Sequence, residues 1–425
     1  MTVFIGLLGC GTVGSGVVEL VERRADKIAE ITGLRPVISK ILVRDIDKPR
    51  EGLVDSSKLT TNAHDILDDK EIDLVIETIG GIEPAREYIL SALRSGKHVV
   101  TANKDLIALH GVEILETAER HQVDVLYEAA VGGAIPLIRP LKDSLASSDI
   151  TDLKGIINGT TNYILSKMTQ SSISFETALA EAQRLGYAES DPTSDVEGLD
   201  AARKLTILAS IAFTSTVQLS DVRVQGIRKI TASDVRFADQ LGYVIKLLAV
   251  GTDREGRLSL EVRPSLVPKT HPLAHVSESY NALYVRGDAS GDLMFFGQGA
   301  GSLPTASAVV GDVIEALRNL QLGVSGHSQH VYANHKPAVP SRDFLPYYMR
   351  LSAQDEPGVF AQIAQVFGET EISMSNVLQT PTEDGHAEIV VVSHKASAEH
   401  IDTTLKRLRQ IEQVIDIHTV MPVES

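Results

Sequence analysis

The sequence predicts an α/β protein built from three parts: a doubly wound Rossmann domain, an α+β domain and a C-terminal ferredoxin-like domain. Three observations lead to this prediction. Near-continuous apolar runs of strand length alternate with helix-like stretches over residues 1–130, a pattern typical of a parallel sheet covered by helices on both faces. From about residue 150, strands alternate with longer helices. Beyond residue 345 the order is β, α, β, β, α, β, the split arrangement of ferredoxin-like folds.

The individual elements follow from hydrophobic periodicity. Residues 3–8 form an apolar run that stops at glycines, and residues 37–43 are rich in β-branched side chains, so both are expected to be strands. The first domain is expected to contain strands at 3–8, 37–43, 73–79 and 98–101 and helices at 13–31, 84–94 and 111–121. In the last domain the six elements are expected at 347–353, 358–367, 372–379, 386–394, 397–409 and 414–421.

Domain boundaries follow from breaks in these patterns. Residues 321–344 contain Gly, Ser, His and prolines without periodicity, which is typical of a linker. We therefore expect a first domain at 1–130, a second at 131–320, a linker at 321–344 and a third domain at 345–425. The last helix of the second domain, at about 304–320, is expected to pack back on the first domain.

Composition excludes several classes of protein. A net charge of −16 argues against a nucleic-acid partner, because phosphate binding needs clustered Lys and Arg. The single cysteine cannot form an internal disulfide. No apolar run is long enough to span a membrane, and no basic residue precedes Arg23, which argues against a lipoprotein signal ending at Cys10. We expect a cytoplasmic protein with no membrane partner.

Gly9, Gly11 and Gly14 form a G-x-G-x-x-G motif between the first strand and the first helix. The first glycine permits a tight turn, the second lets the backbone approach a pyrophosphate, and the third lets helix and strand pack closely. The helix N-terminus adds N–H donors and a positive dipole end. The motif predicts dinucleotide binding; the alternative is a turn whose glycines serve packing alone.

The end of the second strand bears on the choice of cofactor. An acidic residue there would bind the 2′-hydroxyl of NAD, whereas an arginine would accommodate the 2′-phosphate of NADP. Arg44 comes first and is followed by Asp45 and Asp47. NADP is therefore favoured and NAD stays open, as does the alternative that Arg44 is a solvated surface charge.

Asp200 and Lys204 stand four residues apart, so they share one helix face. The common fate of such a pair is a surface ion pair that contributes little. Here the same face continues through apolar residues, while Arg203, Thr206 and Ser210 are expected on the wet face. Charged residues are seldom buried unless paired or used, so a buried pair that lines a pocket is favoured.

Other segments are candidates for ligand contact. Lys104 follows the strand at 98–101, and ligands of doubly wound sheets bind beyond the carboxyl ends of the strands. Residues 186–195 form a loop with three carboxylates that would bind a metal, a substrate ammonium group or nothing. Small-residue turns that allow a close backbone approach lie at 128–136, 158–162 and 299–301, the last just before Pro304.

Taken together, these residues resemble homoserine dehydrogenase over almost the whole chain. The segments that carry the resemblance are GLLGCGTVGSGV at 6–17, VVTANKDL at 99–106, EAAVGGAIP at 128–136, NGTTNYIL at 158–165, GYAESDPTSDVEGLDAARKLTIL at 186–208 and GQGAGSLPTA at 297–306. The resemblance implies reduction of L-aspartate 4-semialdehyde to L-homoserine with NAD(P)H, on the route to threonine and methionine. It also implies that the second domain serves catalysis and dimerisation.

The resemblance assigns roles to individual residues. Lys204 is expected to protonate the carbonyl oxygen as hydride arrives, with Lys104 as its partner. The expected substrate contacts are Glu189, Asp200, Asp195, Tyr187, Gly159 and Thr160. The expected cofactor contacts are Gly9, Gly11, Thr12, Val13, Gly14, Arg44, Thr78, Thr101, Lys104 and Gly301. A monovalent cation, usually sodium, is expected on Glu128 and the backbone carbonyls of Val131, Gly133 and Ile135. How Asp200 divides between Lys204 and the substrate stays open.

The C-terminal part resembles an ACT domain through Asp355-Glu-Pro-Gly-Val-Phe360. This implies feedback control by threonine, although a role in oligomerisation alone stays open, as does a homodimer against a homotetramer. A semialdehyde dehydrogenase is excluded, because it needs a cysteine nucleophile and Cys10 lies in the glycine motif. A non-catalytic dinucleotide sensor that gates the C-terminal domain is the remaining alternative.

Overall fold

The computed structural model describes residues 1–48, 54–326, 335–341, 343–382 and 385–424. Its first sheet is parallel throughout, in the order β3-β2-β1-β4-β5-β6. The strands are β1 (Thr2–Leu8), β2 (Arg35–Leu42), β3 (Leu59–Thr60), β4 (Ile72–Glu77), β5 (His98–Thr101) and β6 (Val125–Leu126). This order confirms the doubly wound domain, and its switch point lies between β1 and β4, where such sheets bind ligands.

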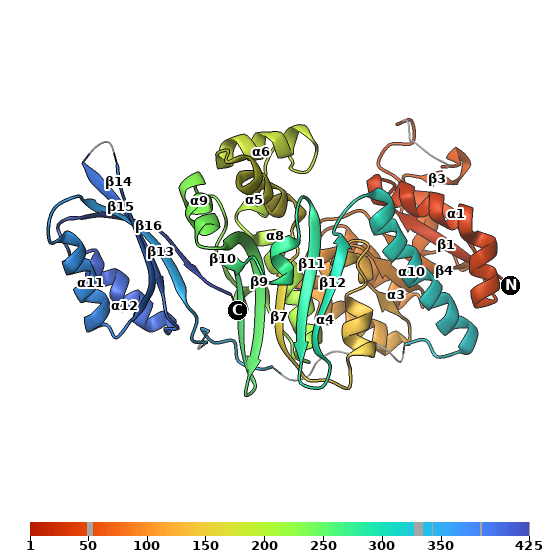
Figure 1. The fold of residues 1–425 in the computed structure, drawn as a ribbon. Helices are drawn as coiled ribbons and strands as arrows, with labels where there is room; N and C mark the ends of the chain where they lie inside the picture. The colour runs from red at the N-terminus through yellow and green to blue at the C-terminus, as the bar shows by residue number, and fades with distance from the viewer. Residues whose placement is uncertain (49–53, 327–334, 342, 383–384, 425) are drawn as a thin grey trace.

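Helices cover both faces of the first sheet (Figure 1). They are α1 (Thr12–Thr32), α2 (His64–Leu67), α3 (Ala85–Arg94) and α4 (Lys104–His121). The helix expected at 111–121 begins earlier, at Lys104, because the Asn103 side chain accepts a hydrogen bond from the backbone N–H of Leu106 and caps it. Lys104 is therefore the first residue of a helix and is held in place by its cap.

A long helix near the end of the second domain lies against the first. Helix α10 (Ser302–Leu322) packs beside α1, and its buried side chains Val309, Val313 and Leu317 share one core with β1 and α1 (Figure 1). The contact is close: a Cβ on Gly16 would lie 3.0 Å from Ser302 Oγ. The predicted linker at 321–344 begins inside the end of α10 and falls partly on residues 327–334 and 342, which are outside the described residues.

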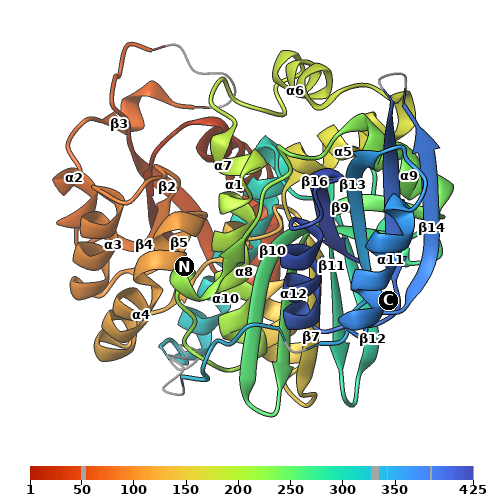
Figure 2. The same cartoon turned by 90° about the vertical axis from the view of Figure 1, so that its left-hand side faces the viewer.

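The second sheet has the order β12-β11-β7-β9-β10-β8, and all its pairs are antiparallel except β8 with β10. Its strands are β7 (Ile150–Ile156), β8 (Arg223–Val224), β9 (Tyr243–Arg254), β10 (Arg257–Pro268), β11 (Tyr280–Gly287) and β12 (Gly291–Gln298). The helices are α5 (Gly159–Ser171), α6 (Phe175–Arg184), α7 (Thr193–Val196), α8 (Leu199–Ala212) and α9 (Ala232–Gln240). Helix α8 contacts α4 of the first domain and β9 and β10 of its own (Figure 2).

The prediction that Arg203, Thr206 and Ser210 form a solvent-exposed face of α8 is wrong for Thr206. Thr206 is only 2% exposed, because α8 is enclosed between the first domain and the second sheet. Its hydroxyl donates to the Ala202 carbonyl at 2.9 Å, which satisfies the buried polar group within the helix. Arg203 is half-buried and forms an ion pair with Asp105 of α4 at 3.0 Å. Helix α8 therefore lies between the two domains, and most of its residues are buried.

The third domain has the expected order β13 (Tyr347–Gln354), α11 (Val359–Glu369), β14 (Met374–Pro381), β15 (His386–Ser393), α12 (Ala398–Leu408) and β16 (Val414–Pro422). Its antiparallel sheet, β14-β15-β13-β16, confirms the ferredoxin-like fold. One face packs on α11 and α12, while Tyr348, Val390 and Met421 on the other face join the core of the second domain (Figure 1). No described helix is long and apolar enough to cross a membrane.

Buried ion pairs fix the third domain on the second. Glu424 contacts Lys154 at 2.8 Å and Arg263 at 2.9 Å. Arg350 donates at 2.7 Å to Asp234, a buried residue in the first turn of α9 that forms a capping box with Thr231. Burial would raise the pKa of Glu424, but Arg263 and Lys154 overcome it and lower the pKa to about 2. The attachment therefore depends on charges enclosed on both sides of the domain boundary.

We expect Glu424→Gln to lower the free energy of unfolding by about 3 kcal/mol at neutral pH, because it leaves buried cations without their partner. The folded pKa of about 2 lies below the usual 4.5, so the carboxylate stabilises fully above 4.5 and loses this contribution as the pH falls toward 2. Chemical denaturation at several pH values measures the difference, with the exposed Glu412→Gln as control. A difference that stays constant as the pH falls through this window contradicts the assignment.

Candidate active site

Two lysines from different domains meet on one carboxylate. Lys104 begins α4 directly beyond β5, and Lys204 lies one turn after Asp200 on α8. The Lys104 Nζ lies 3.1 Å from one Asp200 oxygen, and the Lys204 Nζ lies 2.6 Å from the other. Lys204 also donates to the backbone carbonyl of Ile157 at 2.8 Å. The structure thus brings together the two lysines that the sequence singled out.

Asp200 is buried but stays charged. Burial by itself would raise the pKa of Asp200, but the ammonium groups of Lys204 and Lys104 hold it well below its usual range. Desolvation disfavours the charged form of Lys104, yet Asp200 outweighs it and raises the pKa of Lys104. Because two ammonium groups share one carboxylate, Lys104, Lys204 and Asp200 by themselves carry one positive charge in excess, which the nearby Asp195 carboxylate partly offsets. Such an excess suits a site where negative charge develops on an oxygen.

Asn158, which the sequence places only in a small-residue turn, links the acids of the cluster. Its Nδ2 donates to Asp195 at 2.7 Å and to Asp200 at 2.9 Å. Its Oδ1 accepts from the Thr161 N–H at 2.8 Å and so caps α5. The available signal was an Asn directly before Gly159 at the start of a helix, which is typical of a cap. Its contact with the acids depends on tertiary structure.

The carboxylate loop at 186–195 lies beside this cluster. The Thr160 hydroxyl donates to the Tyr187 carbonyl at 2.6 Å, which ties the loop to the first turn of α5. The pKa of Asp195 is raised, by burial first and also by the nearby Asp200 charge. Glu189 is exposed, and its carboxylate has no partner within the described residues. Gly159 packs tightly, since a Cβ there would lie 2.9 Å from the Ser279 carbonyl oxygen.

The glycine motif has the geometry that its three roles require. Gly9 has a φ of 99°, and a Cβ on Gly14 would lie 2.3 Å from the Gly9 oxygen, so the turn and the close packing both need glycine. A Cβ on Gly11 would meet nothing within 4 Å, which leaves room for a ligand. The Thr78 hydroxyl donates to the Gly9 carbonyl at 2.9 Å. The motif is thereby fixed to the end of β4.

The glycine motif also touches the turn before α10. Ser302 Oγ donates to the Thr12 carbonyl at 2.6 Å, and Val13 follows in the first turn of α1. Gly301 precedes α10 with a φ of 126°, a conformation that favours glycine. The two glycine-rich segments proposed to contact the cofactor are therefore neighbours.

The side chain of Thr101, a residue expected to contact the cofactor, forms its hydrogen bonds within the protein. The residue is fully buried, and its hydroxyl donates to Glu77 at 2.6 Å and accepts from the Asn103 N–H at 3.0 Å. Burial raises the pKa of Glu77, whose carboxylate also accepts from the backbone N–H of Gly80 at 3.0 Å. The Thr101 hydroxyl therefore links the end of β5 to Glu77 at the end of β4.

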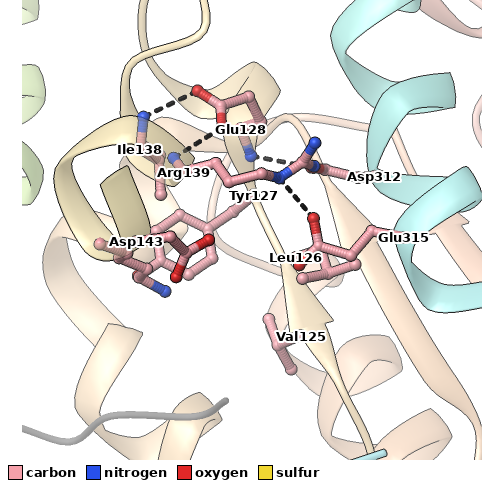
Figure 3. Close-up of a pocket in the computed structure, with 10 residues that line it drawn as sticks. Val125, Leu126, Tyr127, Glu128, Ile138, Arg139, Asp143, Asp312 and Glu315 are labelled. Atoms are coloured by element: carbon pink, nitrogen blue, oxygen red, sulfur yellow. Dashed lines mark hydrogen bonds and ion pairs between the residues drawn. The ribbon is translucent and has the colours of Figure 1, made fainter. Parts of the chain in front are cut away.

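The turn expected to hold a cation contains buried carbonyl groups. The Glu128 carboxylate accepts three backbone N–H groups, from Leu137 at 2.6 Å, Ile138 at 2.7 Å and Arg139 at 2.9 Å. Figure 3 shows the bonds from Ile138 and Arg139. Among the described residues, no hydrogen-bond donor contacts the carbonyl oxygens that the sequence assigned, those of Val131, Gly133 and Ile135. The described residues contain no cluster of three or more His, Cys, Asp or Glu suited to a metal. Backbone oxygens are therefore the candidate ligands.

A buried acid beside this turn connects the first two domains. Asp312 of α10 accepts from the Glu128 N–H at 2.8 Å and from Arg139 at 3.0 Å, and Arg139 also pairs with Glu315 (Figure 3). Burial and the Glu128 charge raise the pKa of Asp312 to about 8. The cavity that these groups line is small, about 50 Å³, so it is a structural junction and leaves no room for a substrate.

Known proteins similar to this chain were found for each of its three domains and for the chain as a whole. Residues 9–128 match the homoserine dehydrogenase NAD-binding domain, 136–314 match homoserine dehydrogenase and 347–413 match the ACT domain. A homoserine dehydrogenase of Bacillus subtilis is 45% identical to this chain, and the aligned region covers 99% of this chain and 98% of the Bacillus protein. The crystal structure of a homoserine dehydrogenase from Thiobacillus denitrificans has a TM-score of 0.92 at 39% identity, covering 100% of this chain and 99% of that one. A hyperthermophilic archaeal homoserine dehydrogenase in complex with NADPH has a TM-score of 0.63 at 25% identity, over 74% of this chain and 98% of its own.

Two substitutions separate the roles of Asn158. Asn158→Ser keeps a capping oxygen but removes both N–H donors, whereas Asn158→Ala removes both functions. We expect both changes to raise the pKa of Asp195 further, since the Asn158 hydrogen bond lowers it, and Asn158→Ala to cost about 1 kcal/mol more stability than Asn158→Ser. NMR titration of the side-chain carboxyl carbons and chemical denaturation measure the two effects. An unchanged Asp195 pKa in Asn158→Ser would show that the amide does not support the acids.

Proposed function

The chain belongs to the homoserine dehydrogenase family, and we propose that it reduces L-aspartate 4-semialdehyde to L-homoserine with a hydride from NADPH. Membership of this family makes the chain an oxidoreductase with a nicotinamide-binding domain and a C-terminal ACT domain. The observation that carries the reaction is the pair of ammonium groups, Lys104 and Lys204, on the one buried carboxylate of Asp200. A non-catalytic sensor would not need this arrangement.

The chemistry follows from the position of each ammonium group. When bound, the nicotinamide supplies the hydride that reaches the aldehyde carbon. Lys204 donates a proton to the carbonyl oxygen, so the aldehyde gains one hydride and one proton and becomes an alcohol. Lys104, with 36% of its side chain exposed, adds a second fixed positive charge beside the developing oxyanion. Both groups are positioned before the reaction, and stabilisation needs no rearrangement.

The amino-acid end of the substrate requires an acid for its ammonium group. Both Asp200 oxygens are already engaged by Lys104, Lys204 and Asn158. We therefore assign Asp200 to positioning the lysines and assign the ammonium group to Glu189, which is exposed and unpaired within the described residues. Asp195, which Asn158 joins to Asp200, would complete the acidic side of the site, and Tyr187, Gly159 and Thr160 would shape its wall.

NADP is the cofactor that the residues favour. Arg44 lies exposed just beyond β2, and no ion pair neutralises it among the described residues. A free guanidinium at this position suits a 2′-phosphate. The open space at Gly11 beside the first turn of α1 suits the pyrophosphate. The archaeal relative in complex with NADPH supports the same choice.

We further propose that a monovalent cation, Na⁺, binds at the turn after Glu128. Its ligands would be the carbonyl oxygens of Val131, Gly133 and Ile135, which are buried and lack donors in the described part of the chain. The Glu128 carboxylate, engaged by three N–H groups, would shape the turn. The cation would hold this turn against the segment before Gly301, since Gly133 packs directly on Gly299.

The pathway and the regulation of the enzyme are inferred from its family and from the ACT domain. We propose that the enzyme serves threonine and methionine biosynthesis and that threonine controls it through the ACT domain. A homodimer or homotetramer is supported by aromatic side chains that the single chain leaves open: Phe296 is 55% exposed and stacks on Tyr280, which is 39% exposed.

We expect Lys204→Ala to lower kcat by about a hundredfold or more, because proton donation and charge stabilisation are both lost. NADPH affinity should change little, since Lys204 lies on the second domain. NADPH oxidation with L-aspartate 4-semialdehyde measures turnover, and the exposed Lys27→Ala is the control. No oxidation by well-folded unaltered protein would defeat the proposed function, and a mild effect of Lys204→Ala would remove Lys204 from the role of proton donor.

Arg44→Ala should weaken NADPH about tenfold more than NADH, because a charged hydrogen bond to the 2′-phosphate contributes about 1.5–3 kcal/mol. Steady-state KM values for the two cofactors, compared with those of Arg24→Ala on the exposed side of α1, measure the difference. Equal weakening of both cofactors would refute recognition of the 2′-phosphate by Arg44.

A further inference from the structure

Glu77 is a fully buried carboxylate that the proposed reaction does not use. It ends β4, and its neighbours across the parallel sheet are Leu8 of β1 and Thr101 of β5. Among the described residues, no lysine, arginine or histidine forms an ion pair with it. Charged side chains are almost never fully buried without a partner or a use. Because this is the switch point of the sheet, where ligands bind, the position asks for an explanation tied to the site.

Three donors from two segments converge on the Glu77 carboxylate. Its Oε1 accepts the backbone N–H groups of Ile79 at 2.8 Å and Gly80 at 3.0 Å, and its Oε2 accepts the Thr101 hydroxyl at 2.6 Å. Burial raises the pKa of Glu77, and these hydrogen bonds oppose the rise. An amide would present an N–H₂ group to one of the two sides and could not accept from both. The arrangement therefore requires two acceptor oxygens, which a carboxylate provides.

The Thr101 hydroxyl extends this restraint to the start of α4. It accepts the Asn103 N–H at 3.0 Å, and the Asn103 side chain caps α4. Lys104 is the first residue of that helix, and its Nζ lies 3.1 Å from an Asp200 oxygen. Two hydrogen bonds thus join the Glu77 carboxylate to the residue that directly precedes Lys104.

The same carboxylate fixes the loop that follows β4. Gly80 and Gly81 have φ values of 77° and 73°, and a Cβ on either would meet nothing within 4 Å. The Asn103 Nδ2 donates to the Gly81 carbonyl at 2.7 Å, so the loop is bound to the start of α4 as well as to Glu77. The loop and the first turn of α4 are therefore held together at the carboxyl edge of the sheet.

We propose that Glu77 is a positioning residue that acts through the Thr101 hydroxyl and fixes the Lys104 ammonium group in the active site. Asp200 attracts this ammonium group from the second domain, whereas Glu77 restrains the backbone that carries it in the first domain. Misplacement of a reacting group by about 1 Å lowers a rate by about a hundredfold, so the restraint matters for the reaction. The effect on turnover rests on the proposed function, whereas the effect on the Lys104 pKa does not.

The pKa of Lys104 in the full-length protein without cofactor tests the proposal. Asp200 raises this pKa against the effect of burial, so a looser contact lowers it. Glu77→Gln and Thr101→Val should therefore both lower the Lys104 pKa. Thr101→Val keeps the shape and the net charge, which separates loss of the hydrogen bond from loss of the Glu77 charge. NMR titration of lysines labelled with ¹³C at Cε measures the pKa, with the Lys104 signal assigned by its absence in Lys104→Arg.

Thr117→Val is the matched control. Thr117 is also buried and lies on α4, but its hydroxyl donates to the Glu113 carbonyl within the helix. This variant should leave the Lys104 pKa unchanged, and thermal denaturation checks that each variant is folded. An unchanged Lys104 pKa in either folded variant, Glu77→Gln or Thr101→Val, overturns the proposal, as does an equal shift in Thr117→Val. Should Glu77→Gln fail to fold, Thr101→Val decides.

A double-mutant cycle shows whether the restraint acts on turnover through Lys104. Thr101→Val leaves the Glu77 bonds to the loop in place and should lower kcat about tenfold. Added to Lys104→Met, the same change should lower kcat less than twofold, because the group that it positions is already gone. A tenfold loss in both backgrounds overturns action through Lys104. Turnover by the unaltered enzyme tests the proposed function separately.

Discussion

The site depends on one constraint: the Asp200 carboxylate must be buried and still carry its charge. Burial alone opposes the charge, and Lys204, Lys104 and Asn158 together overcome that opposition. The lysines come from α4 of the first domain and α8 of the second, and the amide comes from the cap of α5. The cluster therefore exists only while the two domains stay docked, and the proposed function places cofactor and substrate at this same docking surface.

The chain secures that docking by crossing the domain boundary twice. It leaves the first domain through the turn after Glu128 and returns with α10, which packs on α1. Asp312 of α10 accepts the Glu128 N–H, and Ser302 donates to Thr12 in the glycine motif. These contacts fix the first turn of α1, where a dinucleotide phosphate would bind, relative to the helix that carries Lys204. A loosely hinged pair of domains would not keep two ammonium groups within hydrogen-bonding distance of one carboxylate.

Several features were predictable from residues alone, and others were missed for identifiable reasons. The glycine motif and the Asp200–Lys204 spacing are local patterns, so the sequence exposed both. Thr206 was expected to face solvent because its side chain is polar. A threonine can be buried in a helix, however, when its hydroxyl donates to a backbone carbonyl of the same helix, as Thr206 does to Ala202. The cofactor contact expected of Thr101 stays a prediction, since the structure shows only that its hydroxyl donates to Glu77. Asn158 was seen only as part of a turn, since its acidic partners lie far along the chain.

The sequence by itself determined the three folds, the phosphate-binding turn and the lysines and acids available for chemistry, because periodicity, glycine conformation and helical spacing are local properties of the chain. Only the tertiary structure decided which of these groups meet. It placed Lys104 and Lys204 on the same carboxylate and buried Asp200 between them. The physical reason is that burial and pairing, which set the charge and the availability of each group, arise from residues distant in sequence.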